Sequence, residues 1–245
     1  MIWRWAFILL NLSACATFIA LGNWQLDRLS WKKALISRVE QRVSAPAVPA
    51  PTPGQWRELS RESHEYLHVS LYGRFLAEYN TLVVAATEKG SGYWVLTPLL
   101  TDNHGTVLIN RGYIGQGAQP APAPGGEVTV SGLLRLTEPD GGFLRANDPA
   151  AKRWYSRDVV AIGSALSLSL APYFVDADTG QPGSAGNVDF DGEQSVQNPL
   201  GGLTVINFSN SHRVYALTWY TLALMAAGAC VFLFRDHLHH SKTRP

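Results

Sequence analysis

The sequence is poor in charge and in cysteine. Asp, Glu, Lys and Arg make up 16% of its 245 residues, the formal net charge is +1, and there are two cysteines. So balanced a chain offers no strongly basic surface for nucleic acid and no excess of charge for an acidic partner. Cys15 and Cys230 lie in apolar segments near opposite ends, and their spacing predicts neither a disulfide nor a zinc cluster.

Most signatures of catalysis are also missing from the sequence, which has no G-x-S-x-G elbow, phosphate loop, C-x-x-C pair or dinucleotide fingerprint. One zinc-protease pattern, H-E-x-x-H, occurs as "HEYLH" at 64–68. That chemistry needs both histidines on one helical face, whereas "YLHVSLYGRF" alternates like a strand, along which residues four apart are about 13 Å apart. We therefore interpret His64 and His68 as surface histidines at a strand entry and predict that the protein is not an enzyme.

Apolar residues, in contrast, are abundant at 46%, and two runs of them are long. Residues 5–24 and 215–234 are each long enough to cross the roughly 30 Å hydrocarbon core of a bilayer. Aromatic residues lie near the ends of these runs, as in an interfacial belt: Trp3, Trp5, Trp24, Trp219 and Tyr220. We predict two transmembrane helices, with both termini on one side of the bilayer.

Two other interpretations of the N-terminus exist. The string "LSAC" has the form of a lipoprotein box with Cys15 as the acylated residue, and Arg4 before an apolar stretch is compatible with a cleavable signal. Because the apolar run continues past Cys15, we expect an uncleaved span. Basic residues are almost equally numerous on both sides of the spans, so charge alone does not give the orientation.

Residues 25–214 are predicted to form one extramembrane domain. Residues 25–43 have apolar positions at helical spacing, which indicates an amphipathic helix leaving the membrane, and the proline-rich "SAPAVPAPTPG" ends it. Short strands separated by turn residues follow: "YLHVSLYGRF", "TLVVAAT", "YWVLTPLLT", "TVLINRGYI" and "EVTVSGLLRL". We predict a mainly antiparallel α+β domain resembling a small barrel.

The remaining segments complete this prediction. "RDVVAIGSALSL" is predicted to be a helix, "PYFVDA" a strand, residues 176–202 a loop, and "LTVINF" a strand that leads into the second span. Residues 235–245 form a tail whose histidines, His237, His239 and His240, we expect to be solvated.

The second span begins with an unusual group of side chains. On a helix, His212, Tyr215 and Trp219 share one face, and small residues such as Ala216 and Ala223 lie on another. A neutral imidazole is a common axial ligand of haem iron, and Arg213 could face a propionate. The same residues also fit an interfacial belt with no ligand, and the pattern alone leaves both interpretations open.

Beyond these patterns, the sequence resembles the surfeit locus protein 1 family along nearly its whole length. The segments that carry the resemblance include "LGNWQLDRLSWKKALISRVEQR", "YGRF", "GYWVLTPLL", "VLINRGYI", "VSGLLRLTEP", "NDPAAKRWYSRDVVAI", "FVDAD" and "NPLGGLTVINFSNSHRVYALTWYTLAL". Their order, between two apolar spans, is more specific than any one of them. The long loop containing "GQPGSAGNVDFDGEQSVQ" departs from the family pattern, and its role stays open.

The resemblance implies a function in the assembly of haem–copper cytochrome c oxidase. It implies transient binding of haem a and delivery to the catalytic subunit of the oxidase, with haem a synthase as a further expected partner. By position, His212 corresponds to the family's haem ligand and Trp219 to its aromatic neighbour. Tyr215 and Arg213 would then contact the macrocycle and a propionate. A protein-only scaffold for an oxidase intermediate is the alternative.

The resemblance also implies a location. It places both termini in the cytoplasm or the mitochondrial matrix and the central domain in the periplasm or the intermembrane space, which would resolve the balanced charge count. Because no Arg-rich, Ser-rich transit segment precedes the first span, we expect the inner membrane of a bacterium rather than a mitochondrial membrane.

Overall fold

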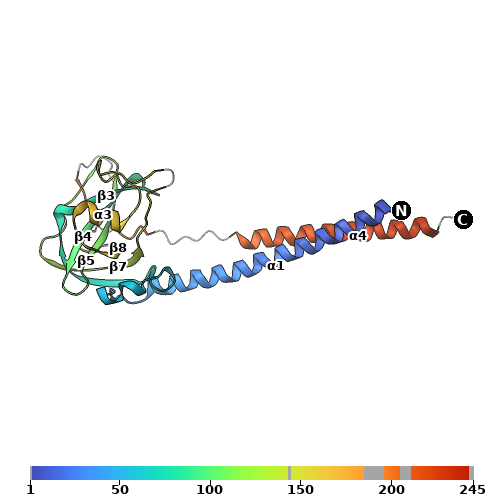
Figure 1. Ribbon diagram of the computed structural model, residues 1–245, viewed down its shortest axis with the longest axis horizontal. Coiled ribbons are helices and arrows are strands. Elements are labelled where there is room, and N and C mark those ends of the chain that lie inside the picture. Colours follow the sequence, from blue (N-terminus) through green and yellow to red (C-terminus); the bar gives the residue numbers. More distant parts are fainter. Residues whose placement is uncertain (1, 143–144, 185–195, 205–210, 243–245) are drawn as a thin grey trace. The chain divides into compact units, whose positions relative to one another are not determined.

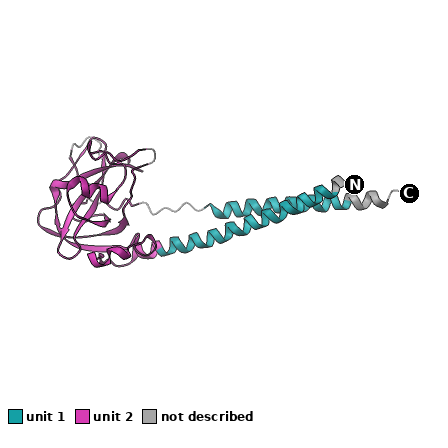
Figure 2. Cartoon of the chain, viewed as in Figure 1, with its two compact units in different colours: residues 1–38, 207–245 teal, residues 39–206 magenta. Residues whose placement is uncertain are grey.

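The chain divides into two compact units, shown in Figure 2. The computed structural model describes residues 2–142, 145–184, 196–204 and 211–242, with side chains except at 2–4 and 236–242. Residues 1–38 and 207–245 form the first unit, which we call the helix pair. Residues 39–206 form the second unit, which we call the barrel domain.

The helix pair contains most of α1 (Ile2–Ser44) and all of α4 (His212–Lys242). The two helices are antiparallel in Figure 1, because Ile8 of α1 lies beside Cys230 of α4 and Gln25 lies beside His212. Helix α1 runs without a break through both the predicted span and the predicted amphipathic segment. It ends at Ser44, two residues before Pro46, whose ring cannot continue a helix.

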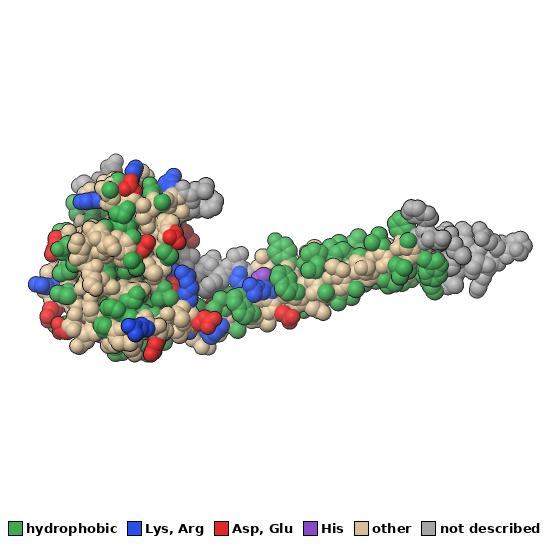
Figure 3. Space-filling view, in the orientation of Figure 1, with side chains coloured by type: hydrophobic (Ala, Val, Ile, Leu, Met, Phe, Trp, Pro, Cys, Tyr) green, Lys and Arg blue, Asp and Glu red, His purple; other side chains and the backbone are tan. Residues whose placement is uncertain are grey.

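The surface of the helix pair is largely apolar, as Figure 3 shows. Large side chains point away from the pair with more than half of their surface exposed: Leu9, Leu10, Leu217, Leu224 and Phe232. Each helix contains a window with a mean hydropathy of 1.8 that is long enough to cross a bilayer. Apolar surface of this extent is stable in lipid rather than in water, so the prediction of two transmembrane helices is confirmed.

The barrel domain is built on one mixed sheet. Its strands are β1 (Val48–Pro49), β2 (His68–Phe75), β3 (Thr81–Thr87), β4 (Gly90–Thr101), β5 (Thr106–Gly115), β7 (Glu127–Leu136) and β8 (Leu170–Ala177). A separate pair joins β6 (Gln119–Pro120) to β9 (Val196–Gln197). The helical segments are η1 (Pro53–Glu58), α2 (Arg61–His64), η2 (Ala77–Tyr79) and α3 (Val159–Leu166).

Five of the described strands close into a small barrel. The sheet order is β1-β2-β7-β8-β5-β4-β3, and β2 also pairs with β4, which joins the two sides of the sheet. Gly73 sits at this closure opposite Thr101, and a Cβ there would lie 2.2 Å from the carbonyl oxygen of Leu100. The glycine of the "YGRF" segment therefore permits the closing strands to approach each other.

Two apolar cores stabilise this domain. Alternating residues of the barrel strands fill its interior, including Leu71, Leu99, Ile109, Leu134 and Val175. A second core lies under α3, where Ile162 packs with Val83, Leu108 and Trp154. Asp158 caps the start of α3 by accepting a hydrogen bond from the amide of Ala161, and Ser167 ends it in a left-handed conformation.

The predicted fold class is confirmed, with some differences in detail. Strands β5 and β8 pair in parallel, although most pairs in the sheet are antiparallel. Of the predicted loop 176–202, residues 176–177 end β8 and residues 196–197 form β9, whereas residues 185–195 lie outside the described residues. Residues 203–204 of the predicted strand "LTVINF" are in no strand, and its other residues lie outside the described residues. The side chains of His237, His239 and His240 are also outside them.

Candidate functional site

His212 is the first residue of α4, and its side chain points toward α1. Its Nδ1 lies 2.8 Å from Oε1 of Gln25, which is 9% exposed. With that oxygen as acceptor, Nδ1 carries a proton and donates it, and in a neutral imidazole the lone pair is then on Nε2. Among the described residues, Nε2 has no hydrogen-bond partner. The hydrogen bond therefore orients the imidazole with Nδ1 toward α1 and leaves Nε2 available.

Aromatic side chains from both helices follow His212. The ring of Trp219 stacks on Phe18 of α1, with centroids 5.8 Å apart and planes 25° apart. Tyr215 is 54% exposed and points away from α1, and Arg213 is also exposed. The structure thus divides the predicted residues: His212 and Trp219 contact α1, whereas Tyr215 and Arg213 face outward.

The small residues of α4 pack against α1. Ala216, Ala223 and Ala226 are all buried, and Cys15 of α1 donates a hydrogen bond to the carbonyl of Ala223 at 3.5 Å. These small side chains let the two backbones approach closely. The sequence left open whether they would admit a helix or a flat ligand, and in the structure their neighbour is α1.

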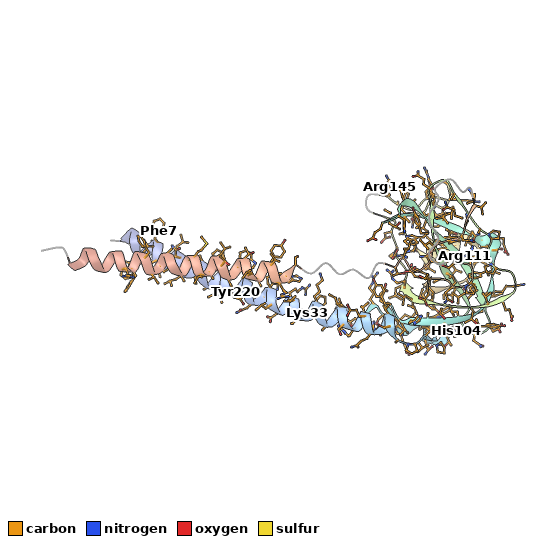
Figure 4. The ribbon with its side chains drawn as sticks, turned by 180° about the vertical axis from the view of Figure 1, so that it is seen from behind. Phe7, Lys33, His104, Arg111, Arg145 and Tyr220 are labelled. Atoms are coloured by element: carbon orange, nitrogen blue, oxygen red, sulfur yellow. The ribbon has the colours of Figure 1, made fainter. Side chains whose placement is uncertain are left out.

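Tyr220 fixes the register of the two helices. Figure 4 shows it on α4 next to α1, where its hydroxyl donates to Oδ1 of Asn23 at 2.7 Å. Its ring covers Gly22, whose position would put a Cβ 2.7 Å from the ring. Residues 22–25, "GNWQ", thus make three contacts with α4. Gly22 lies against the ring of Tyr220, Asn23 accepts a hydrogen bond from Tyr220, and Gln25 accepts one from His212.

Gln25 and Phe18 are the site residues that sequence reasoning missed. Both contact α4 residues about 190 positions away, and no local pattern predicts such a pairing. One signal was present: Asn23 and Gln25 are amides at the end of an apolar run. Polar side chains in such helices usually have a partner in a neighbouring helix.

A haem group fits the chemistry of this donor set. Nε2 of His212 has no hydrogen-bond partner among the described residues, Trp219 and the exposed Tyr215 have aromatic rings, and the exposed Arg213 has a cation for a carboxylate. The described residues contain no group of three or more His, Cys, Asp or Glu side chains that could hold a metal ion. A haem differs from such an ion because its ring supplies four ligands.

The barrel domain contains a buried ionic network. Asp176, 3% exposed, accepts hydrogen bonds from Arg135 and Arg157 at 3.0 Å and from Asn110 at 2.7 Å. Burial alone would lower the pKa of Arg135, but the carboxylates of Asp176 and Glu65 hold that pKa above its usual value. With each arginine bound to at least two carboxylates, this network is a structural element of the barrel.

Arg111, unlike the arginines of this network, is fully buried, with 1% of its surface exposed. Its guanidinium donates to the backbone carbonyls of Gly183, Ala121 and Pro122 at 2.8 to 3.2 Å. Burial lowers its pKa to about 10. It therefore cross-links the β5 strand to two loops rather than facing an open site.

The histidines of "HEYLH" lie on different elements. His64 ends the short helix α2, Tyr66 turns the chain at φ 62°, and His68 begins β2. The interpretation of His68 as a surface residue is wrong, because its Nδ1 lies 2.7 Å from the carbonyl of Ala45 and its Nε2 lies 2.8 Å from Asp178. His68 is a partly buried residue that joins the strand to its neighbours.

Comparison with known proteins places this site in a shared region. The model of the SURF1 family matches residues 12–224. The chain is 32% identical to "Surfeit locus protein 1" of Xenopus tropicalis over an alignment of 237 positions, which covers 87% of this chain and 71% of the relative. The protein of the same name in Homo sapiens is 30% identical over an alignment of 245 positions, which covers 90% of this chain and 73% of the relative.

A third relative also matches most of the chain. "SURF1-like protein" of Monosiga brevicollis is 30% identical over an alignment of 250 positions, which covers 95% of this chain and 89% of that protein. The range matched by the family model includes both Gln25 and His212. The similarity therefore covers the helix pair as well as the barrel domain.

Proposed function

The chain belongs to the SURF1 family, and from this premise we propose that it is an assembly factor for haem–copper cytochrome c oxidase. In this proposal it is a carrier, not an enzyme. It receives haem a from the synthase that makes it and delivers it to the catalytic subunit of the oxidase. The observation that supports haem binding is the orientation of His212, held by Gln25 with Nε2 free.

His212 would be the axial ligand of the haem iron. The hydrogen bond from Nδ1 to Gln25 favours the tautomer with its proton on Nδ1 and fixes the direction of Nε2, as outer-shell partners of metal-binding histidines do. Tyr215 and Trp219 would lie beside the macrocycle, and Arg213 would pair with a propionate. One axial bond holds the cargo less firmly than two, which favours release to an acceptor that offers two.

The helix pair is consistent with this task in a membrane. Because α1 and α4 are antiparallel, two membrane crossings leave the start of α1 and the end of α4 on the same side. We propose that this side is the cytoplasm, that the barrel domain lies in the periplasm, and that the membrane is the bacterial inner membrane. His212 would then lie at the periplasmic edge of the bilayer, where a haem could enter from the lipid.

An absorption spectrum tests the ligand assignment. The protein is co-expressed with the haem a pathway and purified as wild type, His212→Ala and His64→Ala. His64 is a partly exposed histidine of α2, in the other unit of the chain, and serves as the control. We expect haem a in the wild type and the control and its loss from His212→Ala. Equal haem in all three proteins would reject His212 as the ligand.

Gln25 gives a second test of the same geometry. Gln25→Leu keeps the size of the side chain but removes the acceptor, and we expect it to weaken haem binding roughly 10- to 100-fold. Gln25→Glu restores an acceptor and should recover most of the affinity. Asn23→Leu, which removes only the bond to Tyr220, is the control in the same segment. Haem titration of each variant in detergent measures the effect.

The protein-only scaffold is the alternative function. A scaffold of this kind could bind a helix of the oxidase through the small-residue face of α4, but α1 occupies that face. The scaffold would instead use the large exposed side chains of the pair or the barrel domain. Purification of the oxidase subunit together with this protein, with no haem in either wild type or variants, would support the scaffold against the carrier.

A further inference from the structure

The barrel domain has a pocket of about 610 Å³ that the proposed haem site does not use. One side is the face of β3 and β4 that bears Leu82, Val84 and Tyr93. The loop 116–119 and the segment 145–155 form its walls. The volume lies within the range of 300 to 1,000 Å³ that is typical of sites for small organic molecules.

The pocket combines an apolar floor with a basic wall. Leu82, Val84 and Tyr93 form the floor, and Trp154 and Tyr155 add aromatic surface to the wall. The same wall carries three cations, Arg145, Lys152 and Arg153, and none of the residues that line the pocket is acidic. A molecule that fits both surfaces has an apolar body and a negative group.

The cations are held in place by a well-defined hairpin. Asp148 and Arg153 exchange two backbone hydrogen bonds, at 2.8 and 3.0 Å, and their side chains form an ion pair at 3.0 Å. Between them Lys152 adopts a left-handed backbone with φ 52°, a conformation unfavourable for lysine. Asn147 then ties the hairpin down, since its Oδ1 accepts from the amides of Tyr155 and Ser156.

Two of the three cations lack a carboxylate partner in the described part of the chain. Arg153 has Asp148, whereas Arg145 lies over the ring of Tyr155 at 5.5 Å, and no ion pair of Lys152 is found. Figure 4 shows Arg145 at the periphery of the domain, away from the buried Arg111. The buried Arg135 and Arg157, in contrast, each bind at least two carboxylates. The positive charge of this wall is therefore available for a ligand.

A peptide strand is a poorer fit than a small molecule. Strand β3 ends the sheet, so its outer edge would be the place for an added strand. Trp154 already occupies this edge, because the amide of Val84 donates to its carbonyl at 2.8 Å. An extended peptide could not pair along β3 without displacing that residue.

We propose that this pocket binds a small amphipathic anion, with an aromatic or aliphatic body on Leu82, Val84 and Tyr93 and a carboxylate against Arg145 and Lys152. The proposal is independent of the haem assignment, since it uses residues of the barrel domain alone. It assigns the barrel domain a ligand-binding role in addition to its structural one.

The test uses 2-naphthoate as the anion and 2-naphthamide as its uncharged analogue. Each is titrated by calorimetry into the full chain in an uncharged detergent. We expect naphthoate to bind at least tenfold more tightly than naphthamide. The double variant Arg145→Gln/Lys152→Gln should remove that preference, and since both side chains are exposed the fold should be retained, which circular dichroism verifies.

A matched variant and a second probe complete the design. Arg57→Gln/Arg61→Gln removes two exposed cations of the same domain outside the pocket and should bind naphthoate like the wild type. Equal binding of the two probes, or naphthoate binding unchanged in the pocket variant, would overturn the proposal. So would tight binding of a tetraglutamate peptide with no binding of naphthoate, which would indicate a protein partner instead.

Discussion

The helix pair and the barrel domain use polar groups in opposite ways. The helix pair exposes large apolar side chains and places a few polar ones, such as Gln25 and Tyr220, between its helices. The barrel domain instead holds a largely buried network of full charges around Asp176, on the face of β7 and β8 opposite the apolar core that contains Leu134 and Val175. In lipid, apolar side chains can face outward while polar groups pair between the helices. In water, apolar side chains are buried, and a charge that is buried with them must be paired.

This difference determines which kind of substitution should destabilise each unit. A buried charge is stable when its partners are complete, so the barrel domain is sensitive to the loss of one charge. Helices in lipid gain little from apolar burial and depend on close packing, so the helix pair is sensitive to added volume. The predictions below test this contrast in order of decreasing effect.

The largest effect is expected from Asp176→Asn in the barrel domain. The substitution keeps the shape but removes the more buried of the two carboxylates that Arg135 and Arg157 share, Asp176 being 3% exposed and Glu138 32%. We expect a loss of about 3–5 kcal/mol in the free energy of unfolding, the usual result of breaking a buried ion pair. Denaturant unfolding of the full chain in detergent, followed by near-ultraviolet circular dichroism, measures it.

Glu127→Gln is the control for this prediction. Glu127 is an exposed carboxylate at the start of β7 whose partner is the hydroxyl of Tyr72 at the surface. Its neutralisation should change the stability little, because water screens both groups. Equal effects of the two variants would mean that the buried network does not stabilise the barrel.

In the helix pair, Gly22→Ala should have the next largest effect. A methyl group at Gly22 would lie 2.7 Å from the ring of Tyr220, so the ring must move and lose its bond to Asn23. We expect a cost of about 1–3 kcal/mol, as for other overpacked contacts. The rate at which maleimide alkylates Cys15 and Cys230, which both contact the opposite helix, reports the opening of the pair.

Gly228→Ala provides the matched control, because a Cβ there meets no atom within 4 Å. Alanine is also a better helix former than glycine, so alkylation should be unchanged or slower. A similar acceleration by both variants would show that helix propensity or expression, rather than the contact with Tyr220, causes the effect.

The same contrast explains how much the sequence could reveal. The spans and most strands follow from local periodicity, which the residues of each segment carry themselves. The pairing of Gln25 with His212 joins residues 187 positions apart, and the closure of β2 on β4 depends on close backbone approach at Gly73. Such contacts depend on the tertiary arrangement, so local patterns indicated His212 but not its partner.

His68 shows the same limit in the barrel domain. Alternation correctly placed it on a strand but could not reveal Asp178, which is 110 positions away and near the end of β8. The pocket at Arg145 and Lys152 is a further case, because its floor comes from β3 and β4 and its wall from a distant hairpin. Both features form only when the sheet is assembled, so local sequence patterns do not reveal them.

The smallest effect is expected from the titration of His68. Burial alone would lower its pKa, but the hydrogen bonds to the carbonyl of Ala45 and to Asp178 raise the pKa above 6.5. Protonated His68 therefore stabilises the folded state. This contribution is complete below pH 6.5 and disappears as the pH rises through the raised pKa. It should be small, because Asp178 is 35% exposed and water screens the pair.

Denaturant unfolding at several pH values between 5.5 and 8.5 tests this prediction. The wild type should lose stability with rising pH, and His68→Gln should lack that part of the slope. His64→Gln, a histidine on the neighbouring helix α2 bonded to Ser60 and Ser63, should retain it. A slope that persists unchanged in His68→Gln would contradict the assignment. It would mean that water competes successfully for this ion pair even within the folded barrel domain.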